Sequence, residues 1–105
     1  MQTSHSLDAI FKALADANRR FIVECLCDRC DTVSHLSEHL PLSLPTILQH
    51  LRVLEQSGLI RTDKVGRERE VALDPQALER LDRWLALTRP AWDPRLRRLS
   101  VSARG

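Results

Sequence analysis

The sequence has few of the residues that mark several common protein classes. It contains no tyrosine, and its two phenylalanines and two tryptophans make up only 4% of the chain. We therefore expect helices that pack through aliphatic stripes. It has no apolar run close to the ~20 residues of a membrane-spanning helix, and no charged start followed by an apolar segment and a cleavage site. These absences predict a cytoplasmic protein that does not contact a membrane.

Cysteine is scarce and concentrated in one place. All three cysteines lie in VECLCDRC, residues 23–30. An odd number of cysteines in a small chain argues against a secreted disulfide framework. Three interpretations stay open: ligands for a soft metal such as Zn, Cu(I) or As(III), thiols that sense oxidants or persulfides, or structural residues.

Helical geometry narrows the choice among these thiols. Cys25 and Cys27 lie about 200° apart on a helix and cannot chelate one ion together. Cys27 and Cys30 are three residues apart and share a face. His35 and His39 are four apart, a spacing that can bind a metal from one helix face, and Cys30 is the third ligand such a site would use. The alternatives are a buried, structural Cys25 and histidines at a boundary or facing phosphate.

The remaining composition points to one soluble domain. The chain has 105 residues and a net charge of +2, with five basic against one acidic residue in 89–105. Charge alone does not predict a nucleic-acid partner. There is no Gly-rich phosphate loop, no nucleophile beside a base and no paired carboxylates in a plausible cleft, so we expect neither an enzyme nor a cofactor.

Apolar spacing predicts two helices at the start of the chain. The first covers about 6–16 with Ser6 as N-cap, and the second follows Asp16 as its N-cap. The apolar residues at helical spacing, which we expect to face inward, are Leu7, Ile10, Phe11, Leu14, Phe21, Ile22, Cys25 and Leu26.

A helix-turn-helix is predicted over about 34–57. Its first helix starts at Ser34 and stops before Pro41. Its second helix has Ser43 as N-cap and Pro45 in the first turn, and it ends at Gly58. Its inward stripe is expected to consist of Leu44, Ile47, Leu51 and Leu54.

A β-hairpin over about 59–73 follows, with VGRE as its turn, and then a helix over about 75–99 capped by Asp74. Proline inside a helix costs about 3 kcal/mol, so Pro90 should kink or stop this helix near Arg89. Asp93–Pro94 is a possible new start. This order predicts a mainly α fold with a β-hairpin wing: a single winged helix-turn-helix domain.

In that fold the second helix of the motif lies in the major groove of DNA. Its outer side chains are suited to base edges and phosphates: Ser43, Thr46, Gln49, His50 and Arg52. The wing adds Lys64, Arg67 and Arg69, whose charge Glu68 and Glu70 dilute. The same polar face is also compatible with a helix that is merely solvated.

Three segments closely resemble the ArsR family of bacterial winged-helix repressors: LADANRRFIVECL, SLPTILQHLRVLEQSGLI and DKVGREREVALDPQALERLDRWL. The resemblance implies a homodimer that binds an imperfect palindrome near its target promoter. It also implies that the first and last helices form the dimer interface, and that an inducing ligand or modification weakens DNA binding.

The sequence departs from the family pattern at several places. Thr32 and Ser34 stand where the family's usual soft-metal cysteines lie, residues 75–99 contain no histidine, and no cysteine follows Cys30. Leu48 replaces a common serine, so either base preference differs or Leu48 packs inward. Trp84 and Trp92 are expected in the core or the dimer interface.

We therefore expect a dimeric repressor of double-stranded operator DNA. One alternative is a metal- or thiol-responsive sensor that uses Cys27 and Cys30, alone or with His35 and His39. The second alternative is a winged-helix protein-protein interaction module. The operator and the inducer do not follow from the sequence.

Overall fold

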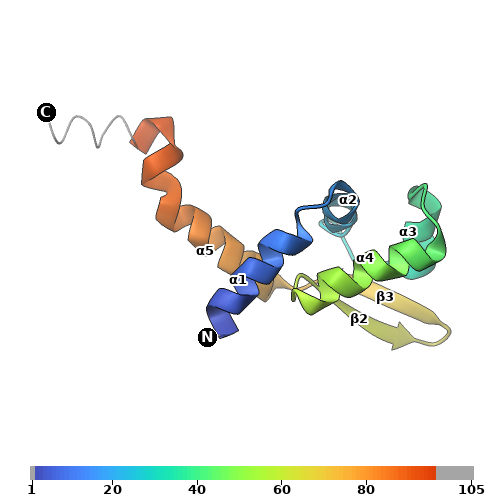
Figure 1. The fold of residues 1–105 in the computed structure, drawn as a ribbon. Coiled ribbons are helices and arrows are strands. Elements are labelled where there is room, and N and C mark those ends of the chain that lie inside the picture. Colours follow the sequence, from blue (N-terminus) through green and yellow to red (C-terminus); the bar gives the residue numbers. More distant parts are fainter. Residues whose placement is uncertain (1, 97–105) are drawn as a thin grey trace, which may run out of the picture.

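The computed structural model describes the backbone of residues 2–96 and the side chains of residues 7–96. The elements follow the order α1 (Gln2–Ala13), α2 (Ala17–Cys25), β1 (Asp31–Thr32), α3 (Val33–His39), α4 (Leu44–Gln56), β2 (Ile60–Val65), β3 (Glu68–Leu73) and α5 (Pro75–Trp92). This is the predicted mainly α fold with a hairpin wing. α1 lies against α5 at one end, while α3, α4 and the hairpin form the other end (Figure 1).

The wing is part of a small antiparallel sheet in the order β1-β3-β2. β2 and β3 pair from Ile60 opposite Leu73 to Val65 opposite Glu68. Gly66 has a φ of 63° in the turn between them, a conformation that glycine adopts without a steric cost. β1 has only two residues, paired with Glu70 and Val71, and was not predicted, since so short a strand has no periodicity to detect.

The caps follow the sequence closely in the middle of the chain. Ser43 caps α4 by accepting a hydrogen bond from the Thr46 N–H. At the other end, the Gly58 N–H donates to the Glu55 carbonyl and the Leu59 N–H donates to the Leu54 carbonyl. With Gly58 at a φ of 85°, these two bonds form a Schellman motif. α4 therefore ends where its glycine predicted.

Two helix starts differ from the prediction. α1 begins at Gln2, so Ser6 lies inside the helix and is not its N-cap. α3 begins at Val33, because the Thr32 hydroxyl accepts from the His35 N–H and acts as the cap. Thr32 precedes the predicted start at Ser34 by two residues, and both are good capping types, so the sequence did not distinguish them.

α5 continues past the predicted stop near Arg89 and ends at Trp92. Pro90 has no N–H and cannot make the backbone hydrogen bond of a helical residue. It lies only two residues before the end of α5, so the helix loses little by including it. The Asp93 N–H still donates to the Arg89 carbonyl at 2.8 Å. Residues 94–96 are helical again, as the Asp93–Pro94 pair suggested, and the ribbon changes direction at this end of α5 (Figure 1). The predicted residues 97–99 of this helix lie outside the described part.

The core is aliphatic, as the lack of aromatic residues predicted. The fully buried large side chains come from α1, α2, α3, α4 and the hairpin: Ile10, Ile22, Leu36, Ile47, Leu54, Leu59, Ile60 and Val71. Three residues expected to face inward are instead exposed, namely Phe11 by 41%, Phe21 by 42% and Leu44 by 51%. Helical spacing places these residues beside the buried stripe, and in the described part of the chain no neighbouring element buries them; Phe11 is covered only in part, by Trp84 of α5.

Arg19 joins three helices. Its Nε donates to the Ala13 carbonyl at 2.7 Å and its Nη2 donates to the Lys12 carbonyl at 3.3 Å. Both carbonyls lie at the end of α1, where few main-chain donors remain; that of Lys12 also accepts from the Ala15 N–H at 3.2 Å. Its Nη1 lies 3.3 Å from Nδ1 of His50 on α4. Arg20 adds a bond to the Leu14 carbonyl at 2.7 Å.

This arrangement predicts unequal roles for two adjacent arginines. Arg19→Met keeps a long side chain but leaves the carbonyl of the buried Ala13 without its hydrogen bond from Arg19, so we expect the free energy of unfolding to fall by roughly 1–3 kcal/mol. Arg20→Met, the matched control at an exposed residue, should cost less. Urea denaturation followed by circular dichroism at one protein concentration measures both. An equal loss in the two variants would contradict a junction role for Arg19.

Candidate nucleic-acid interface

The five polar residues predicted on α4 do not share one environment. Gln49 and Arg52 are exposed on its outer side. Ser43 is exposed, and its hydroxyl lies 2.9 Å from that of the half-buried Thr46. His50 is half-buried and turned toward Arg19 of α2.

The pairing of β2 with β3 separates the charges of the wing. Side chains alternate between the faces of a sheet, and residues opposite one another share a face. Lys64 lies opposite Arg69, and Asp63 lies opposite Glu70. The two basic residues thus share the face of Val71, which is buried in the core, and the acidic pair occupies the other face.

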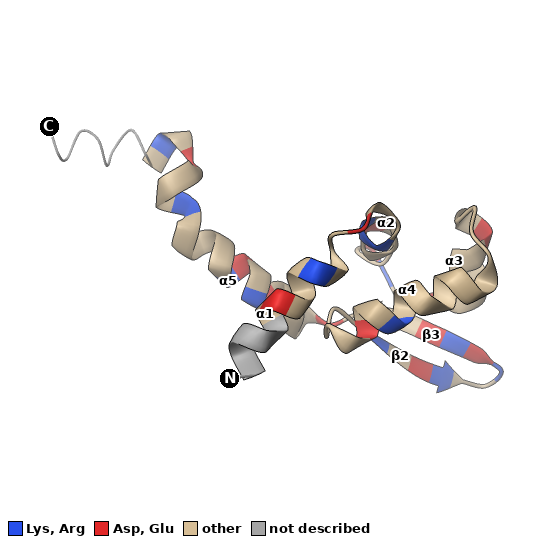
Figure 2. Ribbon diagram, in the orientation of Figure 1, with Lys and Arg blue, Asp and Glu red and all other residues tan. Residues whose placement is uncertain are grey.

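Glu68 also belongs to the acidic face, because it lies opposite Val65, two residues after Asp63. The ribbon of the wing in Figure 2 shows this alternation of positive and negative residues along each strand. Arg67 follows Gly66 in the turn and is exposed. The expected dilution of positive charge by Glu68 and Glu70 is therefore weaker on the face that α4 shares.

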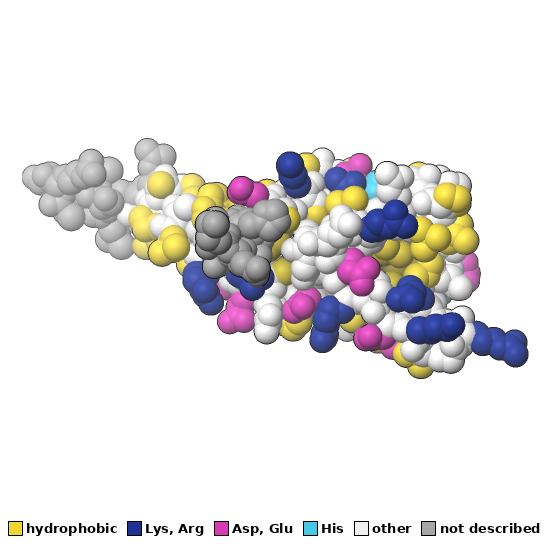
Figure 3. Space-filling view, turned by 60° about the horizontal axis from the view of Figure 1, so that its bottom comes forward, with side chains coloured by type: hydrophobic (Ala, Val, Ile, Leu, Met, Phe, Trp, Pro, Cys, Tyr) yellow, Lys and Arg dark blue, Asp and Glu magenta, His cyan; other side chains and the backbone are white. Residues whose placement is uncertain are grey.

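A chain of hydrogen bonds connects the wing to α4. Nη1 of Arg69 donates to the Thr62 hydroxyl at 2.9 Å, and that hydroxyl donates to Oε2 of Glu55 at 3.0 Å. Between the two elements lies a shallow hollow of about 200 Å³, the α4–wing hollow. Its lining includes Val33, Leu48, Arg52, Glu55, Thr62 and Arg69. Lys and Arg side chains gather beside an apolar surface at this end of the molecule (Figure 3).

Sequence reasoning missed the apolar part of this surface. Leu48 does not pack inward but is 41% exposed, and Leu44, expected in the core, is 51% exposed. The two are one helical turn apart in the first half of α4. The substitution of leucine for a common serine at position 48 was the only signal.

The thiols and histidines lie outside this surface. Cys25 is half-buried, and burial raises the pKa of its thiol. Cys27 and Cys30 are exposed, and the Cys27 thiol donates to the Val23 carbonyl at 3.4 Å. All three cysteines are free thiols.

The histidines of α3 form a chain with a carboxylate. Nδ1 of His35 lies 2.7 Å from Oδ2 of Asp31, and Nε2 of His35 lies 3.3 Å from Nε2 of His39. The hydrogen bond with Asp31 raises the pKa of His35. Partial burial would raise the pKa of Asp31, but the hydrogen bonds from His35 and the Thr32 N–H lower it below its ordinary value.

These residues do not fit a metal centre of the kind the family resemblance implies. The Thr32 hydroxyl is occupied in capping α3, and hydroxyl oxygens are poor ligands for soft metals. In the part of the chain that the structure describes, no group of three or more His, Cys, Asp or Glu side chains could hold a metal ion.

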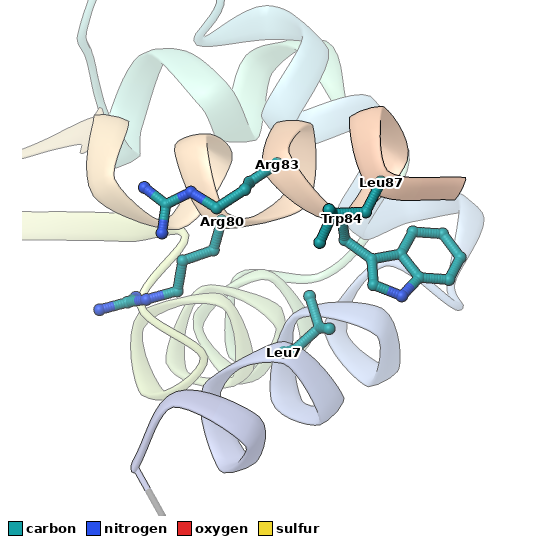
Figure 4. A pocket seen from close by; sticks show the side chains of 5 residues that line it. All are labelled: Leu7, Arg80, Arg83, Trp84 and Leu87. Atoms are coloured by element: carbon teal, nitrogen blue, oxygen red, sulfur yellow. The ribbon is translucent and has the colours of Figure 1, made fainter. Parts of the chain in front are cut away.

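A second exposed surface lies on α1 and α5. Trp84 packs edge-on against Phe11, with ring centroids 5.3 Å apart, yet remains 39% exposed. A hollow of about 200 Å³ next to it is lined by Leu7 of α1, which points toward α5, and by Arg80, Arg83, Trp84 and Leu87 of α5; the two arginine side chains extend away from the Trp84 ring (Figure 4). Leu87 is 76% and Trp92 50% exposed. Neither tryptophan is therefore a core residue.

Comparisons with known proteins agree on one family. Residues 16–62 match the model of the bacterial regulatory proteins of the arsR family. The chain is 41% identical over 81 residues to the HTH-type transcriptional regulator Rv2034 of Mycobacterium tuberculosis, covering 77% of this chain and 76% of that protein. It is 29% identical to the transcriptional repressor SdpR of Bacillus subtilis, covering 75% and 88%.

A solved structure extends this likeness to the whole fold. The ArsR-like transcriptional regulator from Rhodococcus sp. RHA1 superimposes with a TM-score of 0.76 at 32% identity, over 98% of this chain and 97% of its own. Within the described residues, no helix is long and apolar enough to span a membrane.

The Asp31–His35 pair gives a pH prediction. We expect the His35 pKa, measured from its ring protons by NMR, to lie above the ordinary histidine value and to fall in Asp31→Asn. The pair stabilises the fold while both groups are charged. Its contribution is lost as the pH rises through the His35 pKa and as it falls through the Asp31 pKa. Asp28→Asn is the control, and an unchanged His35 pKa in Asp31→Asn would contradict the assignment.

Proposed function

This chain belongs to the ArsR family of bacterial transcriptional regulators, and from that premise we propose that it represses transcription by binding a two-fold symmetric operator as a homodimer. The observation that carries the DNA-binding part is the charge separation in the wing. Lys64 and Arg69 share the face on the side of α4, while the acidic residues lie on the other face together with one basic residue, Arg61. A surface that approaches phosphates needs this arrangement, since contacts between basic side chains and phosphates supply much of the affinity.

In this proposal α4 enters the major groove and the wing reaches the neighbouring backbone. Gln49 contacts base edges, because an amide can donate and accept together. Arg52, Lys64, Arg67 and Arg69 contact phosphates. Ser43 and Thr46 lie at the start of α4, where their hydroxyls and the first N–H groups of the helix can meet a phosphate.

His50 takes a different part in the proposal. Its Nδ1 lies 3.3 Å from Nη1 of Arg19, so it positions α4 against α2, and only its other ring nitrogen is left for a contact with DNA. Its contribution to DNA binding then depends on the helix junction as much as on direct contact.

The homodimer part rests on the apolar surface of α1 and α5. Phe11, Trp84, Leu87 and Trp92 are exposed on these two helices. Contiguous exposed apolar residues of this kind mark interaction sites, and a second copy of the chain buries them in a closed two-fold contact. Two copies of α4 then face half-sites separated by about 10 bp or a multiple of it.

Adjacent wing residues test the DNA interface. Lys64→Ala should weaken the binding of the protein to promoter DNA. The slope of log affinity against log salt concentration should fall by about 1, because one phosphate contact is lost. Asp63→Asn, one residue away on the opposite face, should leave binding nearly unchanged. Fluorescence anisotropy with labelled promoter fragments over a range of salt concentrations measures both.

The results also separate the proposal from a protein-protein module. A wild-type protein that binds no promoter fragment above the level of random DNA would contradict repression by direct binding. Equal effects of the two variants would contradict the assignment of the faces.

The dimer is tested on α5. Leu87→Glu places a charge at the large hydrophobic residue that is most exposed in the described part of the chain, so burial in an interface becomes costly. We expect the dimer dissociation constant to rise by at least about tenfold and operator binding to weaken with it. Asp82→Asn, exposed on the same helix, is the control. Analytical ultracentrifugation gives the oligomeric state, and a Leu87→Glu protein that remains dimeric would exclude this surface.

A further inference from the structure

Two leucines lie on the surface that the proposed function assigns to DNA. Leu44 and Leu48 are exposed by 51% and 41%, whereas Ile47 and Leu51 of the same helix are buried. Because they are four residues apart, they form one apolar stripe along the first half of α4. This is the half that reaches base edges in a helix-turn-helix.

The surroundings of Leu48 restrict what covers this stripe. Leu48 lines the α4–wing hollow together with Arg52 and Arg69. The hollow thus combines an apolar wall with two guanidinium groups and one carboxylate, that of Glu55, which accepts a hydrogen bond from Thr62. The exposed Lys64, which lies opposite Arg69 in the wing, adds a further positive charge beside it. A matching occupant carries negative charge and an apolar group a short distance from it.

Duplex DNA has this combination in its major groove. Thymine presents its C5-methyl group there, between phosphates of both strands, and apolar side chains contact that methyl. We propose that Leu44 and Leu48 read thymine methyl groups in each half-site, so that part of the operator specificity is apolar. The inference rests on the proposed function and names the bases that the recognition helix selects.

The neighbouring polar residues have a distinct part in this scheme. Arg52 and Arg69 hold the backbone, and Gln49, one residue after Leu48, bonds to a base edge. The leucines then select A·T pairs at positions where no hydrogen bond to the base is made. Loss of one buried methyl contact should weaken binding about fourfold.

The test compares thymine with uracil, which pairs identically and lacks only the methyl group. An operator is first selected with the wild-type protein from random duplex DNA. Each thymine is then replaced by deoxyuridine, and the dissociation constants are measured. We expect about fourfold weaker binding for every methyl that a leucine covers, and no change at the other thymines.

Protein variants assign the effect to the leucines. Leu44→Ala and Leu48→Ala should each abolish the preference for thymine over uracil at one position per half-site, and Leu48→Met should keep it. Gln49→Ala is the matched control: it should weaken binding to both operators and preserve their ratio. Circular dichroism melting verifies that each variant is folded.

The outcomes separate this inference from the proposed function. A wild-type protein that selects no DNA sequence overturns both. Specific binding with equal affinity for thymine and uracil operators overturns the leucine contacts alone, and that result needs no variant. A double Leu44→Ala, Leu48→Ala protein that keeps the full preference assigns the methyl contacts to other residues and also overturns the inference.

Discussion

The guanidinium group of Arg19 fixes the position of α1 relative to α4. It binds the last carbonyls of α1 through Nε and Nη2, and its Nη1 meets His50 of α4. α1 carries part of the proposed dimer surface, and α4 carries the proposed DNA surface. In the proposed dimer, this junction would help to set the separation of the two copies of α4. A planar group with several fixed donors suits it better than a lysine, whose single ammonium cannot reach three partners in one plane.

Strand pairing has a comparable effect on the wing. In sequence order its charges alternate, and their sum is close to zero. The antiparallel register places Lys64 opposite Arg69 and Asp63 opposite Glu70. Because side chains alternate between the two faces of a strand, these basic and acidic pairs lie on different faces of the wing. The hydrogen-bond chain from Arg69 through Thr62 to Glu55 then fixes this face against α4. In the proposed DNA complex the phosphates meet only one face of the wing, so the net charge of the chain is a poor guide to its DNA affinity.

Exposed apolar residues were the least predictable feature. Helical spacing predicted that the apolar residues Leu44, Phe11 and Phe21 face inward. Spacing shows on which side of a helix a residue lies, but it does not show whether another element covers that side. Whether a side chain at the edge of a stripe is buried depends on elements far away in the sequence. All three are exposed. The thiol segment shows the reverse case: its clustered cysteines drew attention as chemistry, and the fold places them apart from the α4–wing surface.

The sequence by itself determined the order of the elements, most of the caps and the position of the helix-turn-helix. These depend on local rules: Ser43 and Asp74 as N-caps, Gly58 at a left-handed position, and apolar residues at a helical period. Only the tertiary structure decided that His50 faces Arg19, that Leu44 and Leu48 remain exposed, and that the wing separates its charges. The physical reason is range, since capping and periodicity act within one turn of the chain, whereas burial and the pairing of charges require segments that meet only after folding.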